Sequence, residues 1–336
     1  MTNKERVITS LNHKNTDRVP YALDFTVKAR EKMIEFYNDP HFESKLDNCI
    51  YEMDTAKPDS GKMITTDIWQ DEFGVQWDRT IDKDIGTVCN CIVTPENISS
   101  YEFPELDCSD RFKHYHNNIT KNNDKFVLTG INFSLFERAW ALAGMENMLM
   151  GMLMNPDFVN TLLDRILEYN LKIIEHACDY DIDGMRFGDD WGQQTGLIMG
   201  PNLWREFLKP RLQCMYKKVK SRGKRVFIHS CGKVDEIFPD LIEIGVDVFN
   251  PFQPEVMDVY DIKHEYGDNL SFWGGISTQK TLPYGTVNEI KSETKQLMDN
   301  IGKNGGYIVA PAHCIPGDAK PENIAAMIEV LNNQTG

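Results

Sequence analysis

Short apolar segments alternate with longer amphipathic ones from Lys125 to the end of the chain, and this rhythm restricts the fold more than any other feature. The longer segments, such as NLWREFLKPRLQCMYKKVKSRG, place apolar residues at helical spacing. Strands that alternate with helices in this way form a parallel sheet covered by helices. The six apolar segments of this region are KFVLTG, GMRFG, RVFIH, VDVFN, LSFWGG and YIVAP.

Two further strands are expected nearer the N-terminus, at Tyr21–Asp24 and around Asp67. With the six later ones, about eight strands result, which predicts a (β/α)8 TIM barrel that takes up residues 1–336 as a single domain. ERVITSLN predicts a helical segment before the first strand. A segment that alternates around a glycine-containing turn predicts a β-hairpin insertion from about Glu72 to Val93.

Composition excludes several classes of function. The chain has 51 acidic and 36 basic residues and a formal charge of −15, which argues against nucleic acid as a partner. It contains no apolar run of the ~20 residues that a membrane helix needs, and its beginning does not resemble a signal peptide. We therefore expect a cytoplasmic protein that binds no membrane. The 8 cysteines have no framework spacing and are expected to be reduced thiols, a few of them ligands.

The expected barrel gives special weight to the residues at the C-terminal ends of its strands, because TIM-barrel enzymes carry their chemistry there. A single carboxylate at such a place is more often a helix cap than a catalytic group. Here many polar or metal-binding residues share that position, which favours a site. They are Asp24, Asp67, Asn132, Asp189, Asp190, His229, Cys231, Asn250, Gln253, Trp273, His313 and Cys314.

His229 and Cys231 form the sharpest candidate within this set. They are one residue apart after the apolar run of a strand, so their side chains point to the same side. Imidazole and thiolate are the usual ligands of zinc, and a catalytic zinc site has three protein ligands and an open fourth position. His313 or Cys314 would be the third ligand. The alternative is structural: a histidine bonded to a loop carbonyl and two buried, inert cysteines.

Several motifs together resemble the uroporphyrinogen decarboxylase superfamily, in particular its zinc- and corrinoid-protein-dependent methyltransferases. That branch includes coenzyme M methyltransferases and the O-demethylase methyltransferases of anaerobes. The resemblance spans nearly the whole chain and implies a (β/α)8 barrel. The motifs are KERVITSLNHKNTDRVP, DEFGVQW, FGDDWG, HSCGKV, FNPFQP, FWGGIS and APAHCIPGDAKPENIAAM.

The resemblance also implies a cofactor and a partner. In these methyltransferases an H-x-C pair and a distant cysteine bind zinc, and His229 and Cys231 match the first two positions. Counting back from PENI places the third ligand on His313, whereas residue type favours Cys314. The chain contains no Asp-x-His-x-x-Gly motif for cobalamin, so the cobalamin is expected on a separate corrinoid protein.

The segment YALDFTVKAR distinguishes the chain from the decarboxylases of the superfamily. Decarboxylases have an arginine-rich stretch there, which binds the carboxylates of a porphyrinogen, whereas this chain has Asp24 with only Lys28 and Arg30 nearby. Asp67 does match the aspartate that decarboxylases direct at the pyrrole nitrogens. Metal-independent decarboxylation of uroporphyrinogen therefore stays as an alternative.

The expected activity is methyl transfer between a small methylated compound and the cobalamin of the corrinoid protein, with an O-methyl donor such as a phenyl methyl ether as the leading candidate. Asp189 or Asp190 would protonate the leaving oxygen, complete the zinc shell, orient His229 or cap a helix, and Asp67 is a further catalytic candidate. Further alternatives are a methylcobalamin:thiol methyltransferase and a non-catalytic barrel that binds a corrinoid protein. The expected substrate-binding residues are Asp24, Asn132, Trp191, Asn250, Gln253 and Trp273.

Overall fold

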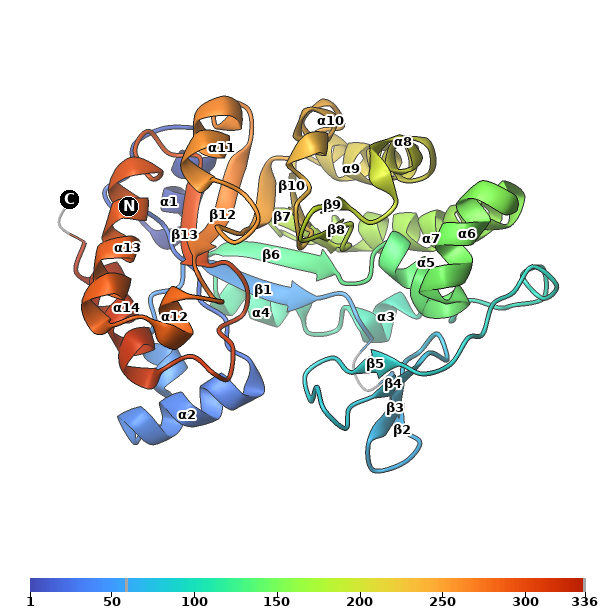
Figure 1. Ribbon diagram of the computed structural model, residues 1–336, viewed down its shortest axis with the longest axis horizontal. Helices are drawn as coiled ribbons and strands as arrows, with labels where there is room; N and C mark the ends of the chain where they lie inside the picture. Colours follow the sequence, from blue (N-terminus) through green and yellow to red (C-terminus); the bar gives the residue numbers. More distant parts are fainter. Residues whose placement is uncertain (58–59, 335–336) are drawn as a thin grey trace.

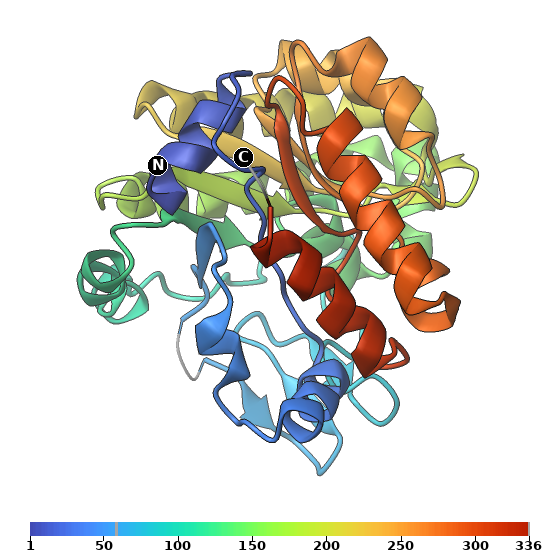
Figure 2. The same cartoon turned by 90° about the vertical axis from the view of Figure 1, so that its left-hand side faces the viewer.

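A curled parallel sheet forms the centre of the computed structural model, which describes residues 1–57 and 60–334. Its seven strands follow one another in chain order, and the helices that connect them lie on the outside (Figure 1, Figure 2). A curled parallel sheet with helices outside it is consistent with the TIM-barrel-like fold that the sequence predicts, although the sheet has seven strands rather than eight. The strands are β1 (Ile50–Asp54), β6 (Phe126–Ile131), β7 (Gly184–Gly188), β10 (Arg225–His229), β11 (Val248–Phe252), β12 (Ser271–Ile276) and β13 (Tyr307–Pro311).

The segment from Tyr21 to Phe25 occupies the gap between β13 and β1. It forms two isolated parallel bridges, Tyr21 with Val309 and Phe25 with Ile315. On its other side the Tyr21 carbonyl accepts the N–H of Cys49 at 2.8 Å, just before β1. The predicted first strand is thus reduced to bridges, which nevertheless connect the two edges of the sheet.

Asp67 does not follow a barrel strand, contrary to the prediction. It lies in the bend just before a strand of a separate antiparallel sheet, and the second barrel position is taken by β1, whose sequence IYEMD carries Glu52. A charged residue in mid-strand hid this strand from the apolar pattern, and Arg186 of β7 neutralises it at 2.9 Å. The insertion has four strands rather than a hairpin at 72–93: β2 (Lys62–Met63), β3 (Ile68–Gln70), β4 (Gln76–Asp78) and β5 (Thr87–Val88).

Helix α1 (Asn3–Leu11) closes the N-terminal end of the barrel. Thr2 and Glu5 form a capping box at its start, and Val7 and Leu11 pack into a buried cluster with Phe227 and other residues of the barrel interior. Helices α6 (Met145–Met154) and α7 (Pro156–Ala177) are separate, because Asn155 caps the second one, which has a proline at its first position.

The other helices surround the sheet or follow its strands. No helix of the described ranges is both long and apolar enough to span a membrane. Two short strands, β8 (Gly192–Gln193) and β9 (Gly196–Leu197), form a hairpin. The helices are α2 (Val27–Tyr37), α3 (Cys108–Arg111), α4 (Tyr115–Lys121), α5 (Phe136–Ala143), α6 (Met145–Met154), α7 (Pro156–Ala177), α8 (Gly200–Leu203), α9 (Lys209–Ser221), α10 (Phe238–Glu243), α11 (Val259–Tyr266), α12 (Thr281–Tyr284), α13 (Val287–Asn300) and α14 (Pro321–Asn332).

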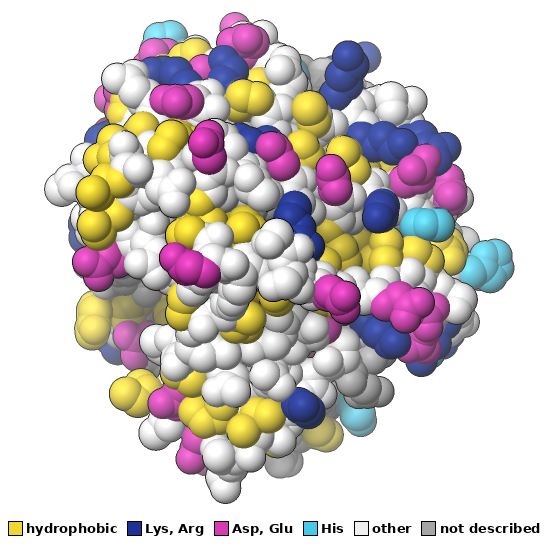
Figure 3. All heavy atoms as spheres, turned by 90° about the vertical axis from the view of Figure 1, so that its right-hand side faces the viewer, with side chains coloured by type: hydrophobic (Ala, Val, Ile, Leu, Met, Phe, Trp, Pro, Cys, Tyr) yellow, Lys and Arg dark blue, Asp and Glu magenta, His cyan; other side chains and the backbone are white. Residues whose placement is uncertain are grey.

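Acidic and basic side chains are interspersed with apolar ones on the face that carries α6 and the antiparallel sheet (Figure 3). Among the described residues, this face therefore carries no large area of acidic side chains alone, despite the excess of acidic residues in the chain.

Asn48 supplies the hydrogen bonds that a longer first strand would have made. Its side-chain oxygen accepts the N–H of Leu23 at 2.9 Å, and its Nδ2 donates to the carbonyl of Leu23 at 3.0 Å. We expect Asn48→Ala to lower the free energy of unfolding by about 1–3 kcal/mol, because two backbone groups lose their partner. Denaturant unfolding measures the loss. Asn117→Ala, at an exposed position of α4, is the control and should leave stability nearly unchanged; equal effects of the two variants would contradict the role of Asn48.

Candidate metal centre and adjoining cavities

His229, Cys231 and His313 come together at the C-terminal end of the barrel. His229 ends β10, Cys231 lies in the turn that follows, and His313 comes two residues after β13. One ligand atom from each lies within 4.8 Å of the other two, and the Sγ of Cys231 is 3.6 Å from the Nε2 of His229. Three side chains from two distant segments thus form a group of the size that a metal ion needs.

Asn250 fixes which nitrogen of His229 faces the cluster. Its Nδ2 donates to the carbonyl of Trp273 at 3.0 Å, so its Oδ1 is left as an acceptor, 2.5 Å from the Nδ1 of His229. The Nδ1 must then carry the proton, which leaves the lone pair of Nε2 directed at Cys231. Burial lowers the pKa of His229 to about 4, so the imidazole is neutral at pH 7, as a ligand must be.

Backbone contacts hold the turn that carries Cys231. The N–H of Cys231 donates to Asp190 at 2.8 Å, and the N–H of Gly232 donates to Gln253 at 2.8 Å. Gly232 has a φ of 87°, and a Cβ there would lie 2.4 Å from the backbone of Gly192. Glycine after Cys231 is therefore required both by conformation and by the close approach of the neighbouring segment.

His313 and Cys314 point in different directions. The Sγ of Cys314 donates to the Oδ2 of Asp24 at 3.0 Å, away from the group of three. Burial, and then the charge of Asp24, raise the pKa of the Cys314 thiol. Both side chains line an open cavity of about 450 Å³, which Gln253 and Tyr284 also border. The structure thus brings His313 to the H-x-C pair and Cys314 to Asp24.

Asp189 and Trp191 are fully buried and have structural partners. The Asp189 carboxylate accepts the backbone N–H groups of residues 135–137 at 2.8–3.1 Å and the Nε1 of Trp191 at 2.6 Å. It therefore caps α5, and burial raises its pKa to about 6. Trp191 packs against Trp204, with ring centroids 5.3 Å apart. The expected proton transfer by Asp189 and substrate contact by Trp191 do not fit these positions.

Two other predicted residues also lie elsewhere. Asp67 lies in the bend just before β3, with its side chain 45% exposed and 3.3 Å from Lys83, which corrects its expected place at the end of a barrel strand. Trp273 belongs to the barrel interior, where its ring lies 6.2 Å from that of Phe227. Its carbonyl, rather than its indole, serves the site through Asn250. Asn132 is at the C-terminal end as predicted, with its Nδ2 3.4 Å from the carboxylate of Asp54.

The sequence reasoning missed two acidic groups near the cluster. Glu137, in the first turn of α5, is held beside Asp190, and its pKa is raised well above the ordinary value by burial and then by the charges of Asp190 and Asp189. Glu52, in the barrel interior, has a pKa raised mainly by burial and is paired with Arg186. Neither stands at a strand end, so only the three-dimensional contacts reveal them.

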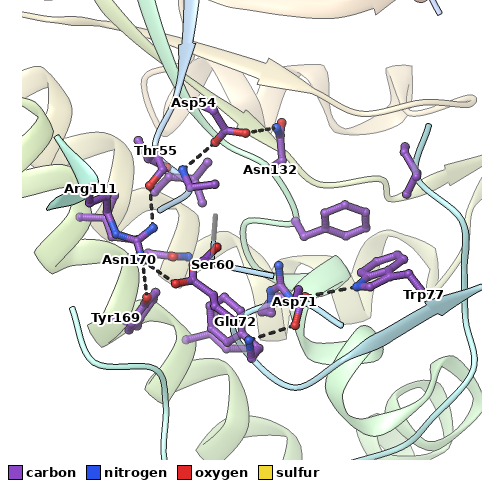
Figure 4. Close-up of a pocket in the computed structure, with 18 of the residues that line it drawn as sticks. Asp54, Thr55, Ser60, Asp71, Glu72, Trp77, Arg111, Asn132, Tyr169 and Asn170 are labelled. Carbon is purple, nitrogen blue, oxygen red and sulfur yellow. Dashed lines mark hydrogen bonds and ion pairs between the residues drawn. The ribbon is translucent and has the colours of Figure 1, made fainter. Parts of the chain in front are cut away.

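A second cavity, of about 300 Å³, lies beside the ends of β1 and β6 and beneath the antiparallel sheet (Figure 4). Asp54 and Asn132 form one end of it, and Trp77 of β4 lies on one side. Most of its lining comes from the insertion, which contains the motif DEFGVQW, and from α7.

Comparison with known proteins gives a match over nearly the whole chain. The uroporphyrinogen decarboxylase (URO-D) family model covers residues 2–334. The methylcobamide:CoM methyltransferase MtaA of Methanosarcina barkeri is 30% identical over 131 residues, 39% of this chain and 36% of that protein. The uroporphyrinogen decarboxylase of Pelodictyon phaeoclathratiforme is 23% identical over 221 residues, 62% of this chain and 59% of that protein. The chain thus spans less than two thirds of the length of these relatives.

A solved structure shares the architecture over the full length. It is described as a methyltransferase from Methanosarcina mazei, and it superposes with a TM-score of 0.71 at 17% identity, covering 99% of this chain and 98% of the other. At this identity the likeness concerns the fold. Since the family model spans residues 2–334, this chain belongs to the uroporphyrinogen decarboxylase family, and the similarity to the methylcobamide:CoM methyltransferase supports the methyltransferase branch of that family.

Proposed function

We propose that the chain is a zinc-dependent methyltransferase, which moves a methyl group between a small methylated compound and the cobalamin of a separate corrinoid protein. The observation that carries the proposal is the group of His229, Cys231 and His313, with the Nε2 of His229 turned toward Cys231 by Asn250. The similarity to a methylcobamide:CoM methyltransferase supports the same reading.

The residues of the group fit zinc. Two imidazoles and a thiolate are a usual ligand set, and three protein ligands would leave a fourth position for a reactant. His313 also lines the open cavity. Burial, and then the charge of Asp190, raise the pKa of the Cys231 thiol, so its thiolate needs a bound cation. Bound zinc would supply Lewis-acid chemistry, polarising an ether oxygen or favouring the thiolate form of a thiol.

The surrounding residues hold the ligands in place. Asn250 keeps the proton on the Nδ1 of His229, and Asp190 and Gln253 hold the backbone on either side of Cys231. The open cavity that His313 borders is where the reactants would approach. Our leading donor is an O-methyl compound such as a phenyl methyl ether, which the aromatic lining of the second cavity supports. A thiol as methyl acceptor is the alternative.

An assay with free cobalamin tests the activity. The zinc-loaded protein is mixed with cob(I)alamin and a panel of phenyl methyl ethers, or with methylcobalamin and a panel of thiols, and the cobalamin spectrum is followed. We expect methylation of cob(I)alamin by an ether, absent in Cys231→Ala. Reaction of methylcobalamin with thiols, without any reaction of the ethers, would rule out the ether as donor and make a thiol the methyl acceptor, while the protein would still be a methyltransferase. If both methyl-transfer reactions are absent and coproporphyrinogen forms from uroporphyrinogen, the proposal is overturned in favour of the decarboxylase.

Metal analysis of purified variants identifies the third ligand. We expect one zinc per chain in the wild type, loss of zinc in Cys231→Ala and His313→Ala, and retention in Cys314→Ala, because His313, and not Cys314, joins His229 and Cys231 in the group whose donor atoms lie within 4.8 Å of one another. Elemental analysis after dialysis measures this. Loss in Cys314→Ala with retention in His313→Ala would instead assign the third position to the thiol.

The orienting role of Asn250 has its own consequence. Asn250→Ala should weaken zinc binding by about 10–100-fold, because His229 loses the acceptor that fixes its tautomer. Competition with a chromophoric chelator measures the affinity. Asn48→Ala makes the same change at a position bonded to Leu23 and should leave the affinity as it is. An unchanged affinity in Asn250→Ala would show that the ring is held by other contacts.

A further inference from the structure

The walls of the cavity beneath the antiparallel sheet are aromatic. Five rings line it: Trp69, Phe73, Trp77, Phe133 and Tyr169. The rings of Trp77 and Phe133 meet edge to face, with centroids 4.9 Å apart. Phe133 has a φ of 52°, a strained conformation for a bulky residue, and this contact helps to hold it. The ring walls are thus fixed in place, and the volume of about 300 Å³ matches one substituted aromatic ring.

Two of the three arginines in the lining already have carboxylate partners. Arg111 is 2.7 Å from Glu72 and also donates to the hydroxyl of Tyr169, and Arg138 is 2.7 Å from Asp71 (Figure 4). Within each of these buried pairs the positive and negative charges neutralise each other, and the pairs line the cavity. They contribute shape and rigidity rather than a free charge.

Arg79 is different. It is partly exposed, its guanidinium lies 4.5 Å from the centre of the Trp69 ring, and its Nε donates to the carbonyl of Ile85 at 3.3 Å. Arg79 forms no ion pair with any residue in the described ranges, 1–57 and 60–334. Its remaining N–H groups form a flat donor edge beside the aromatic walls, which suits a carboxylate or another anionic oxygen group.

The same rings are poorly suited to a cationic ligand. The guanidinium of Arg79 already lies over the ring of Trp69. The guanidinium of Arg138 lies 4.0 Å from the centre of the Phe73 ring and 5.7 Å from the centre of the Phe133 ring. A quaternary ammonium would have to share these ring faces with positive charge. Four carboxylates line the cavity. Glu72 and Asp71 are paired with arginines, and the other two each accept a backbone N–H group: Asp54 from Ala56 and Asp84 from Val27.

The cavity lies near the candidate metal centre. Asn132, at the end of β6, packs over Gly188 of β7, where a Cβ would lie 3.3 Å from the Asn132 side-chain oxygen. Gly188 is the register partner of His229 in β10. Two strand spacings, about 10 Å, therefore separate the end of the cavity from the ligand on β10.

We propose that this cavity binds the aromatic ring of an anionic substrate, with its anionic group on Arg79, and that it discriminates against cationic compounds. That this substrate is the methyl donor rests on the proposed function. The ring site itself stands on the lining residues and is tested without metal or cobalamin.

Calorimetric titration of the metal-free chain tests the site with four compounds: 4-methoxybenzoate, anisole, 4-methoxybenzylamine and 4-methoxycyclohexanecarboxylate. We expect the benzoate to bind most tightly, anisole more weakly, and the amine and the non-aromatic acid weakest. Arg79→Gln should weaken binding of the benzoate by about tenfold or more and leave anisole nearly unchanged. Trp69→Leu should weaken both.

Arg222→Gln is the matched control. It removes one positive charge from the surface at the end of α9, where Arg222 pairs with Asp179, and should not alter binding. Tightest binding of the amine, equal affinities in wild type and Arg79→Gln, or no binding of either aromatic compound would overturn the ring site. Ring binding without methyl transfer by the zinc-loaded protein would contradict the proposed function alone. Methyl transfer from 4-methoxybenzoate that Arg79→Gln and Trp69→Leu leave intact would contradict the ring site alone.

Discussion

The buried carboxylate of Asp189 is the interaction on which the rest of the site depends. It accepts three backbone N–H groups at the start of α5 and the indole N–H of Trp191, so it fastens the segment after β6 to the segment after β7. The next residue, Asp190, holds the backbone of Cys231 after β10. One short acidic segment thus fixes three neighbouring strand ends relative to each other. Removing water from such a carboxylate is costly, and the four donors offset that cost.

The sequence pattern predicted the later half of the fold well because each strand there is apolar and each connection is a clear helix. It failed at β1, where Glu52 enters the barrel interior and is neutralised by Arg186, a partner far away in the sequence. It failed also at Tyr21–Asp24, where a side-chain amide from Asn48 replaces ladder hydrogen bonds. In both places a tertiary contact compensates for a local pattern that does not look like a strand.

In the candidate metal centre, too, the local sequence pattern predicted one part and tertiary contacts decided the rest. The spacing of His229 and Cys231 predicted that they face the same way, and they do, although the strand ends at His229 and the turn held by Asp190 and Gln253 places Cys231. The choice between His313 and Cys314 depends on how the chain leaves β13 and on Asp24, which engages the thiol. Asp189 was a candidate for proton transfer or for a helix cap, and the structure shows the cap; Trp191 was expected to contact substrate, yet its indole N–H donates to Asp189 within the protein. Glu137 was invisible because its neighbours, Asp189 and Asp190, come from another strand end.

The antiparallel sheet is a single excursion of the chain between β1 and β6, which pair directly with each other in register. Its length and sequence can therefore change while the β1–β6 ladder keeps all of its hydrogen bonds. The metal ligands lie on β10 and after β13, so they do not share a segment with it. The insertion can therefore vary in length and sequence without moving a residue of the candidate metal centre, and the barrel strands can be kept while the walls of the cavity change.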